Sequence, residues 1–184
     1  FCTHAPSFID LSEFGHIQMI NKGVYDGESI KETRVNSTST KEVAELLEKA
    51  WAKPSGAFSE ESIKSRMHIF GTELSEGFFA DAVVLVEGVS DKAAIQTVAE
   101  LMGHSLAAHN IAVLSVSGKS NLDKPCAVFK KLEIPVFLIW DSDEGCTKTA
   151  TKETNKALQR MLDVNDTKVE EYPEGVFESF ACFK

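Results

Sequence analysis

The sequence predicts an α/β fold with a parallel sheet, because three short apolar runs alternate with helical patterns. The runs cover residues 82–86, 111–116 and 136–140, and continuous apolar runs of this length are typical of parallel strands buried on both faces. Apolar residues at helical spacing lie between them, over 90–103 and around 128–132. This alternation indicates crossover connections and a parallel βαβαβ sheet flanked by helices.

The first 80 residues are predicted to form two further parts. Residues 1–35 hold short apolar groups broken by glycines, which indicates strands and turns without a core of their own. Residues 36–80 open on a polar run in which Ser39 and Glu42 have the spacing of a capping box, the signature of a helix start. We therefore expect a small helical connecting region over 36–80.

Several helix boundaries can be predicted from capping and helix-ending residues in the sequence. A helix is expected to begin at Ser59 and to carry one apolar stripe, namely Ile63, Met67, Phe70 and Leu74. Ser90 is expected to cap the helix after the first strand, and Gly103 to close it. The apolar positions of that helix are Ala94, Ile95, Val98, Leu101 and Met102. Residues 148–162 are predicted to be helical, and Val169 with Tyr172 indicates a fourth strand.

Composition limits the class of protein. The chain has 184 residues, a length at which one domain can bury a core without disulfides. The net charge of -9 excludes a basic coat of the histone kind, although it leaves room for a local nucleic-acid site. No C-x-x-C pair indicates a zinc or thioredoxin-type site, so reduced thiols in a cytoplasmic protein are expected.

The sequence holds no apolar run approaching a membrane span, so a membrane partner is not expected. It begins F-C-T-H-A-P, without a start Met or a signal-peptide pattern, and it ends inside an apolar, strand-like stretch. We therefore expect it to be a piece of a longer protein.

Polar residues follow each predicted strand at its carboxyl end. The first strand runs into Glu87 and Gly88, with Asp91 one helical turn later. The second runs into S-G-K-S at 117–120, and the third into D-S-D-E at 141–144. Ligands bind beyond the carboxyl ends of the strands in open α/β sheets. If the strands are neighbours, these side chains converge on one small volume.

Carboxylates gathered in this way predict a divalent metal site. The candidates are Glu87, Asp91, Asp141 and Asp143, with Glu144 as a further ligand or an outer-shell group. Like charges in one small volume raise one another's pKa, and divalent cations remove the conflict. Oxygen ligands suit Mg²⁺ or Mn²⁺, and no histidine lies near these motifs in sequence. A lone D-x-D or Glu-Gly is usually only a turn, but their coincidence at three strand ends favours a metal site.

The G-K-S sequence at 118–120 matches the end of a phosphate-binding P-loop without completing the motif. The earlier glycine that the motif requires is Val113, so Lys119 is not a Walker lysine. Gly88 and Gly118 would let the backbone approach a ligand closely. With Lys119 and Ser120 they are candidate contacts to phosphate or DNA, while a plain surface role for Lys119 stays equally open.

Three motifs resemble the Toprim domain of the overcoming-lysogenisation-defect (OLD) nucleases. They are V-V-L-V-E-G-V-S-D at 83–91, S-V-S-G-K-S-N-L at 115–122 and I-P-V-F-L-I-W-D-S-D-E at 134–144. The resemblance implies a Toprim nuclease domain over 81–184, truncated at its C-terminal end. It also implies cleavage of DNA, or of RNA, with two Mg²⁺ or Mn²⁺ ions. Glu87, Asp91, Asp141 and Asp143 would then be metal ligands, with Glu87 the best candidate for proton transfer.

A second resemblance lies at the N-terminus. T-H-A-P-S-F-I-D at 3–10 is similar to the stretch that ends the ABC-type ATPase domain of the same family, where His4 would be the switch histidine. Residues 1–35 would then be a remnant of that domain, and ATP and a homodimer partner would act only through the missing upstream part. A further carboxylate and lysine of the family lie beyond the D-x-D, so the fragment alone is expected to cleave poorly.

Two other classes of protein remain open from the residues themselves. A receiver-like phosphoacceptor domain also gathers acids at strand ends, but it needs a lysine after a later strand, and none is evident. A non-catalytic interaction module would use the acids only to bind a structural ion. Phosphorylation by a small phosphodonor distinguishes the first class, and metal-dependent stabilisation without cleavage the second.

Overall fold

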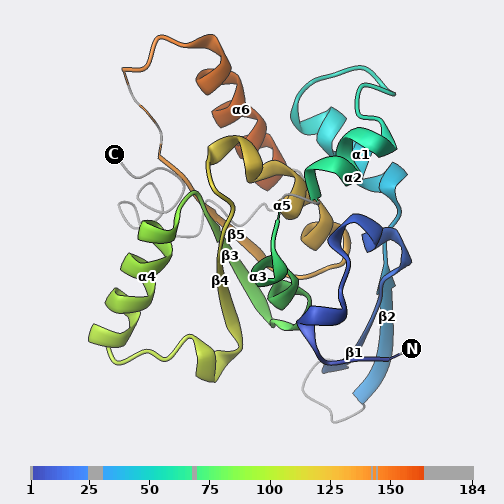
Figure 1. Ribbon diagram of the computed structural model, residues 1–184, viewed down its shortest axis with the longest axis vertical. Helices are drawn as coiled ribbons and strands as arrows, with labels where there is room; N and C mark the ends of the chain where they lie inside the picture. Colours follow the sequence, from blue (N-terminus) through green and yellow to red (C-terminus); the bar gives the residue numbers. More distant parts are fainter. Residues whose placement is uncertain (1, 25–30, 68–69, 142, 144, 164–184) are drawn as a thin grey trace.

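The computed structural model describes residues 2–24, 31–67, 70–141, 143 and 145–163. Figure 1 shows an α/β protein in which a small parallel sheet lies between α4 and a group of helices that includes α5. The strands are β1 (Gln18–Val24), β2 (Lys31–Ser37), β3 (Ala82–Val86), β4 (Ile111–Ser115) and β5 (Val136–Ile139). The helices are α1 (Thr40–Ala50), α2 (Glu60–Met67), α3 (Thr72–Ser75), α4 (Val89–Leu101), α5 (Asp123–Lys131) and α6 (Thr149–Asp163).

The parallel sheet has the strand order β4-β3-β5, so the first predicted strand lies in the centre. Val86 at the end of β3 pairs with Ser115 of β4 and with Ile139 of β5. The three strands therefore end at the same level, which is what brings their following loops to one edge. The predicted α/β class and its three parallel strands are confirmed, whereas the fourth strand predicted at Val169 and Tyr172 lies outside the described residues.

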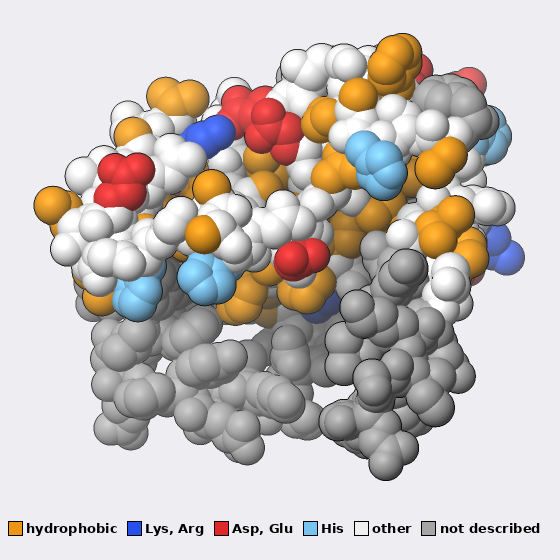
Figure 2. All heavy atoms as spheres, turned by 90° about the horizontal axis from the view of Figure 1, so that it is seen from below, with side chains coloured by type: hydrophobic (Ala, Val, Ile, Leu, Met, Phe, Trp, Pro, Cys, Tyr) orange, Lys and Arg blue, Asp and Glu red, His pale blue; other side chains and the backbone are white. Residues whose placement is uncertain are grey.

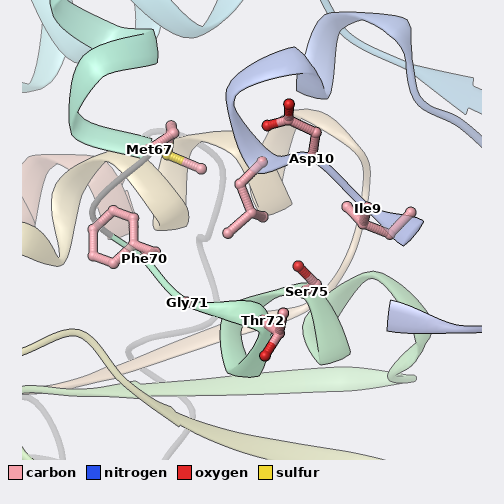
Figure 3. Close-up of a pocket in the computed structure, with 8 residues that line it drawn as sticks. Ile9, Asp10, Met67, Phe70, Gly71, Thr72 and Ser75 are labelled. Carbon is pink, nitrogen blue, oxygen red and sulfur yellow. The ribbon is translucent and has the colours of Figure 1, made fainter. Parts of the chain in front are cut away.

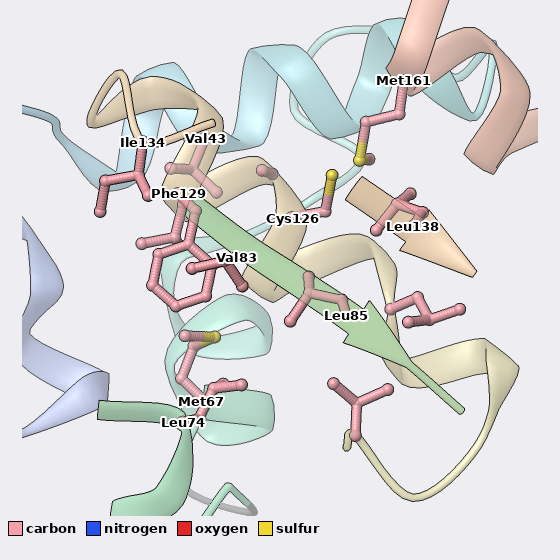
Figure 4. Packing of buried hydrophobic residues seen from close by; sticks show 14 of the residues in the cluster. Val43, Met67, Leu74, Val83, Leu85, Cys126, Phe129, Ile134, Leu138 and Met161 are labelled. Atoms are coloured by element: carbon pink, nitrogen blue, oxygen red, sulfur yellow. The ribbon is translucent and has the colours of Figure 1, made fainter. Parts of the chain in front are cut away.

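One face of this sheet packs against α5 and forms the main core. Val83 and Leu85 of β3 point into a cluster with Cys126 and Phe129 of α5, to which α1, α2 and α6 add apolar residues (Figure 4). The Phe129 ring meets Phe78 edge to face, with 5.2 Å between the ring centroids. Complete burial raises the pKa of the Cys126 thiol to about 12. The stability of the domain therefore rests on this face.

Among the described residues, the opposite face is covered thinly, by α4 and by Leu106 in the segment that follows it. A small cluster of Val86, Val113 and Ile139 meets Ile95 of α4, but no residue of α4 is buried. Leu101 is 83% exposed and Met102 67% exposed. The apolar positions at the C-terminal end of this helix are therefore not covered by the described residues. Gly88, and not Ser90, is the N-cap, although Gly103 closes the helix at φ +78° as predicted.

The N-terminal elements contribute to the main core, because Leu11 and Phe14, which precede β1, are buried in it. β1 and β2 pair antiparallel, with Gln18 opposite Ser37, so β2 crosses the boundary expected at residue 35. The capping box is confirmed, since Ser39 Oγ accepts from the Glu42 N–H and the Glu42 carboxylate accepts from the Ser39 N–H. The hydrogen bonds that the Glu42 carboxylate accepts from the Ser39 hydroxyl and from the Ser39 N–H hold the pKa of Glu42 below its usual value.

The single helix expected from Ser59 to Leu74 is two helices in the structure. Ser59 caps α2 by accepting from the Ser62 N–H at 3.2 Å, as predicted, but α2 ends at Met67. The short α3 begins after Gly71, whose extended backbone (φ -72°, ψ -179°) serves as its N-cap. The buried residues Met67 and Leu74 share one core across this break, which explains why their spacing resembles that of one helix. None of the described helices is long and apolar enough to cross a membrane.

Candidate functional site

The first and third strand ends are joined directly by a side chain. Glu87 follows β3, and its Oε1 accepts a hydrogen bond from the backbone N–H of Asp141, which follows β5, at 2.8 Å. The bond is possible because the parallel register places these residues side by side at the carboxyl edge of the sheet. The convergence of these two predicted residues is thus observed.

Asp143 extends this network by one more bond. Its backbone N–H donates to Asp141 Oδ1 at 3.1 Å, and its carbonyl accepts from the Cys146 N–H at 2.8 Å. Asp143 has φ +50°, in the left-handed region that non-glycine residues seldom adopt and that clusters at functional sites. Asp143 is therefore held in a left-handed conformation and bonded to Asp141.

The loop after the second strand contributes a positively charged side chain, that of Lys119. The S-G-K-S loop turns through Ser117 (φ +58°) and Gly118 (φ +121°), and the Gly118 N–H donates to the Glu87 carbonyl at 2.7 Å. Asn121 steadies the turn, because its Nδ2 donates to the carbonyls of Val116 and Ser117. In this conformation Lys119 Nζ lies 2.6 Å from Asp143 Oδ2.

The Lys119–Asp143 ion pair joins the second strand end to the third. The Lys119 side chain is 10% exposed and that of Asp143 is 45% exposed. A hydrogen-bonded chain therefore runs from Lys119 through Asp143 and Asp141 to Glu87. The sequence predicts that these motifs meet at one edge of the sheet, but it does not predict the Lys119–Asp143 pair, since no spacing rule connects residues 24 positions apart. Asn121 belongs to the S-G-K-S-N-L motif, so the sequence could have indicated it.

The other predicted site residues are less closely joined to this chain of bonds. Asp91 Oδ2 accepts from the Gly88 N–H at 2.9 Å, so its observed contact is the capping of α4. Ser120 is exposed beside Lys119, and Glu144 lies outside the described residues. The structure therefore brings together Glu87, Asp141, Asp143 and Lys119 and leaves Asp91 turned towards its own helix.

The donor set suits Mg²⁺ or Mn²⁺ in its chemistry, because every candidate ligand is a carboxylate, and Glu87, Asp141 and Asp143 lie at the carboxyl edge of the parallel sheet. Within the described part of the chain, no group of three or more His, Cys, Asp or Glu side chains is arranged to hold a metal ion. One oxygen each of Glu87, Asp141 and Asp143 is already hydrogen-bonded within the network. To hold a cation, the side chains of Glu87, Asp141 and Asp143 would thus have to rotate, while the backbone around them could stay as it is.

A cysteine that sequence reasoning did not select lies beside this site. Cys146 follows the D-x-D loop, and hydrogen bonds from the Lys148 backbone and the Thr151 hydroxyl lower the pKa of its thiol. Its sulfur is 3.7 Å from Thr151 Oγ1. The C-x-x-C criterion used for cysteines does not detect an isolated thiol of this kind.

A pocket lies elsewhere in the molecule. It measures about 340 Å³ and is lined by residues around the start of the chain and by the segment from α2 to α3, including Asp10, Met67, Phe70, Thr72 and Ser75 (Figure 3). None of the strand-end carboxylates lines it. His4 is exposed in the N-terminal segment, far from the carboxyl ends of the parallel strands in Figure 1.

The surface seen in Figure 2 has no broad basic area. Hydrophobic, acidic and histidine side chains are interspersed there, and Lys and Arg are sparse. A net charge of -9 agrees with this picture. The described part of this face therefore offers no extended basic surface to a nucleic acid.

Comparison with known proteins agrees with the arrangement of the three strand ends. Residues 78–143 match the family model of the overcoming lysogenization defect protein-like TOPRIM domain. An OLD nuclease of Thermus scotoductus is 24% identical over 170 residues, which cover 86% of this chain and 29% of that protein. The chain thus spans less than a third of the length of this relative. Residues 78–143 therefore resemble an OLD-like Toprim domain, and the three-stranded parallel sheet of the structure is consistent with a Toprim fold.

Proposed function

We propose that this chain carries the nuclease site of an ATPase-nuclease of the OLD family, which cleaves DNA phosphodiester bonds with two divalent metal ions. The hydrogen bond from the Asp141 N–H to Glu87 is the observation that carries the proposal, because it holds the Glu87 carboxylate, which follows β3, against the backbone of Asp141, which follows β5. The Toprim family match and the name of the Thermus scotoductus relative support the same class of activity.

The proposed ligands are Asp141, Asp143, Glu87 and Asp91, with Glu144 as an additional ligand or outer-shell group. Bound divalent cations would supply charge neutralisation for the phosphate and a water of lowered pKa. Asp141 and Asp143 are held in shape by their own backbone bonds, so they would orient the ligand cluster. Asp91 would have to leave the Gly88 N–H that it caps in the structure.

Glu87 is the proposed proton acceptor. One of its oxygens accepts from the Asp141 N–H, which fixes the carboxylate at the mouth of the sheet and leaves the other oxygen for a water molecule. A general base must lie within hydrogen-bond reach of the proton that it accepts. Gly118 and Lys119 would line the path of the phosphate, with Gly88 and Ser120 at its edges.

The remaining parts of the proposal concern the longer protein. We propose that residues 1–35 are the end of an ABC-type ATPase domain with His4 as its switch histidine, that 36–80 connect the domains, and that 81–184 contain the Toprim domain. ATP dependence and homodimer formation would follow from that ATPase domain, in a cytoplasmic enzyme. The 29% coverage of the relative leaves room for such a domain.

The test is metal-dependent nicking of supercoiled plasmid DNA, measured for the chain itself and for its longer parent protein. The parent protein should nick DNA with Mg²⁺ or Mn²⁺, and the chain alone should do so only weakly. Asp141→Ala in the parent should lose at least about a hundredfold in rate if metal-held charge stabilises the transition state. Asp81→Ala is the matched control, since Asp81 is an exposed carboxylate just before β3, at the opposite edge of the sheet.

Full activity in Asp141→Ala would contradict the proposed mechanism. Binding of metal without cleavage of DNA or RNA, in the parent protein as well, would instead favour the non-catalytic interaction module. Circular dichroism of both variants shows whether the fold is intact.

A further inference from the structure

Lys119 occupies an unusual position among the basic residues of the site. Within the part of the chain that the structure describes, Lys119 is the one basic residue that forms an ion pair with Glu87, Asp141 or Asp143, and its partner is Asp143. Its side chain is only 10% exposed, so the ammonium group is turned inward to the carboxylates and away from solvent. A lysine poised to meet DNA would present its charge outward.

We propose that Lys119 is the built-in counter-cation of the metal-free site, and that a divalent metal ion binding at Asp143 displaces its ammonium group. This inference rests on the proposed function and adds a step of regulation to the same site. The bond of 2.6 Å between Lys119 Nζ and Asp143 Oδ2 engages an oxygen that a cation would otherwise take.

Electrostatics supports the assignment. Three carboxylates are linked through two backbone N–H groups, and these bonds neutralise no full charge. Like charges held this close are costly unless a cation is present, and charge-assisted hydrogen bonds of this length are the strong ones. The ammonium group of Lys119 therefore stabilises the site before metal arrives and competes with the metal afterwards.

The shape of the S-G-K-S loop supports it as well. Ser117 and Gly118 both have positive φ, and the Gly118 N–H is bonded to the Glu87 carbonyl. The backbone thus aims Lys119 across the sheet edge at the D-x-D loop. A partly exposed lysine pair makes the contrast clear, because Lys92 and Glu73 also lie 2.6 Å apart but join α4 to α3 and involve none of these carboxylates.

Displacement of the Lys119 ammonium group by a metal ion would also free it for the proposed phosphate contact. While Lys119 is paired with Asp143, nine-tenths of its side chain is covered, so it is poorly placed to meet a phosphate oxygen. Once released by the metal, the ammonium group would lie at the mouth of the sheet with no carboxylate partner. The proposal therefore orders two events at one site, with metal first and the phosphate contact second.

The experiment is a titration of the 184-residue protein with Mn²⁺, followed by the electron paramagnetic resonance signal of free Mn²⁺. Lys119→Met removes the charge and keeps the length of the side chain, so Mn²⁺ should bind about fivefold to tenfold more tightly than in wild type. Lys119→Arg keeps the charge and should stay within about twofold of wild type.

Lys148→Met is the matched charge control, because Lys148 is an exposed lysine shortly after the D-x-D loop. It should change the affinity by less than about twofold, as expected for a solvent-screened charge. Asp141→Ala should abolish the binding, which shows that the measured site is the strand-end site. Circular dichroism confirms that each variant is folded.

Each result has a definite meaning. Tighter binding in Lys119→Met, with Lys148→Met unchanged, is the expected outcome. Equal or weaker binding in Lys119→Met, with wild-type binding still abolished by Asp141→Ala, overturns the counter-cation role and leaves the proposed nuclease site standing. Equal tightening in both lysine variants overturns it too, because the effect would then be general charge. Absence of Mn²⁺ binding in wild type would overturn both proposals.

Discussion

α4 and α5 follow neighbouring strands of one sheet, yet they differ sharply in burial. Six of the nine residues of α5 are buried, whereas none of the thirteen in α4 is. α5 fills the core between the sheet and the other helices, and α4 touches the opposite face mainly through Ile95. Among the described residues, the apolar packing of the sheet therefore lies mainly on the side of α5. The strand-end site, at the edge between the two faces, is shaped by polar bonds instead of by packing.

The largest expected effect comes from the core side of this comparison. Phe129→Ala should lower the free energy of unfolding by about 3–5 kcal/mol, since it removes a fully buried ring and leaves a cavity. Leu101→Ala in α4 should change it by less than about 0.5 kcal/mol, because that side chain is 83% exposed. Urea unfolding of both variants measures the difference. Equal losses would show that α4 is buried to the same degree in solution.

A second substitution sharpens the comparison by adding a methyl group. A Cβ on Gly77 would lie 2.5 Å from Phe129 Cζ and 3.0 Å from Leu114 Cδ1, so Gly77→Ala overpacks the core. We expect a loss of about 1–3 kcal/mol in the free energy of unfolding. Gly71→Ala is the control, since nothing lies within 4 Å of the added Cβ and the residue does not need positive φ. A neutral Gly77→Ala would mean that the core around Phe129 is loosely packed.

The smallest effect concerns the capping box of α1, outside the sheet. Ser39→Ala removes the cap of the helix, so the free energy of unfolding should fall by about 1 kcal/mol at pH 7. The hydrogen bonds from Ser39 lower the pKa of Glu42 in the folded state. Their contribution to stability is therefore present above the ordinary glutamate pKa and is lost as the pH falls through the lowered value.

The difference between wild type and Ser39→Ala should therefore shrink in acid. Thermal unfolding followed at pH 7 and again below pH 4 provides the measurement. A difference that stays constant across this range would show that Glu42 takes no part in the cap.

Much of the framework was predictable from the sequence. The three apolar runs predicted the strands, because buried parallel strands carry no polar alternation, and the capping box at Ser39 marked the start of α1. The burial of α4 was not predictable in the same way. Periodicity shows that one face of a helix is apolar, but it does not show what covers that face, and Leu101 and Met102 are exposed here.

The sequence predicted that carboxylates gather at the strand ends, and the structure joins three of them and Lys119 by hydrogen bonds. Residues such as Glu87 and Asp141 were placed by topology, which sequence patterns reveal. The pairing of Lys119 with Asp143 depends instead on positive φ values at Gly118 and at Asp143 itself, and the directions of two loops cannot be derived from spacing. Asp91 was expected to face the cluster, yet the nearest donor available to it is the N–H of its own helix cap.

The central claim is that the strand-end carboxylates form one divalent metal site. Calorimetric titration of the 184-residue chain with Mn²⁺, beside the Asp141→Asn and Asp81→Asn variants, tests it most directly. Both substitutions remove one negative charge with little change in shape, but only Asp141 lies in the network with Glu87. The account predicts that Asp81→Asn binds Mn²⁺ as wild type does and that Asp141→Asn does not bind it. Equal binding by all three proteins would contradict the account.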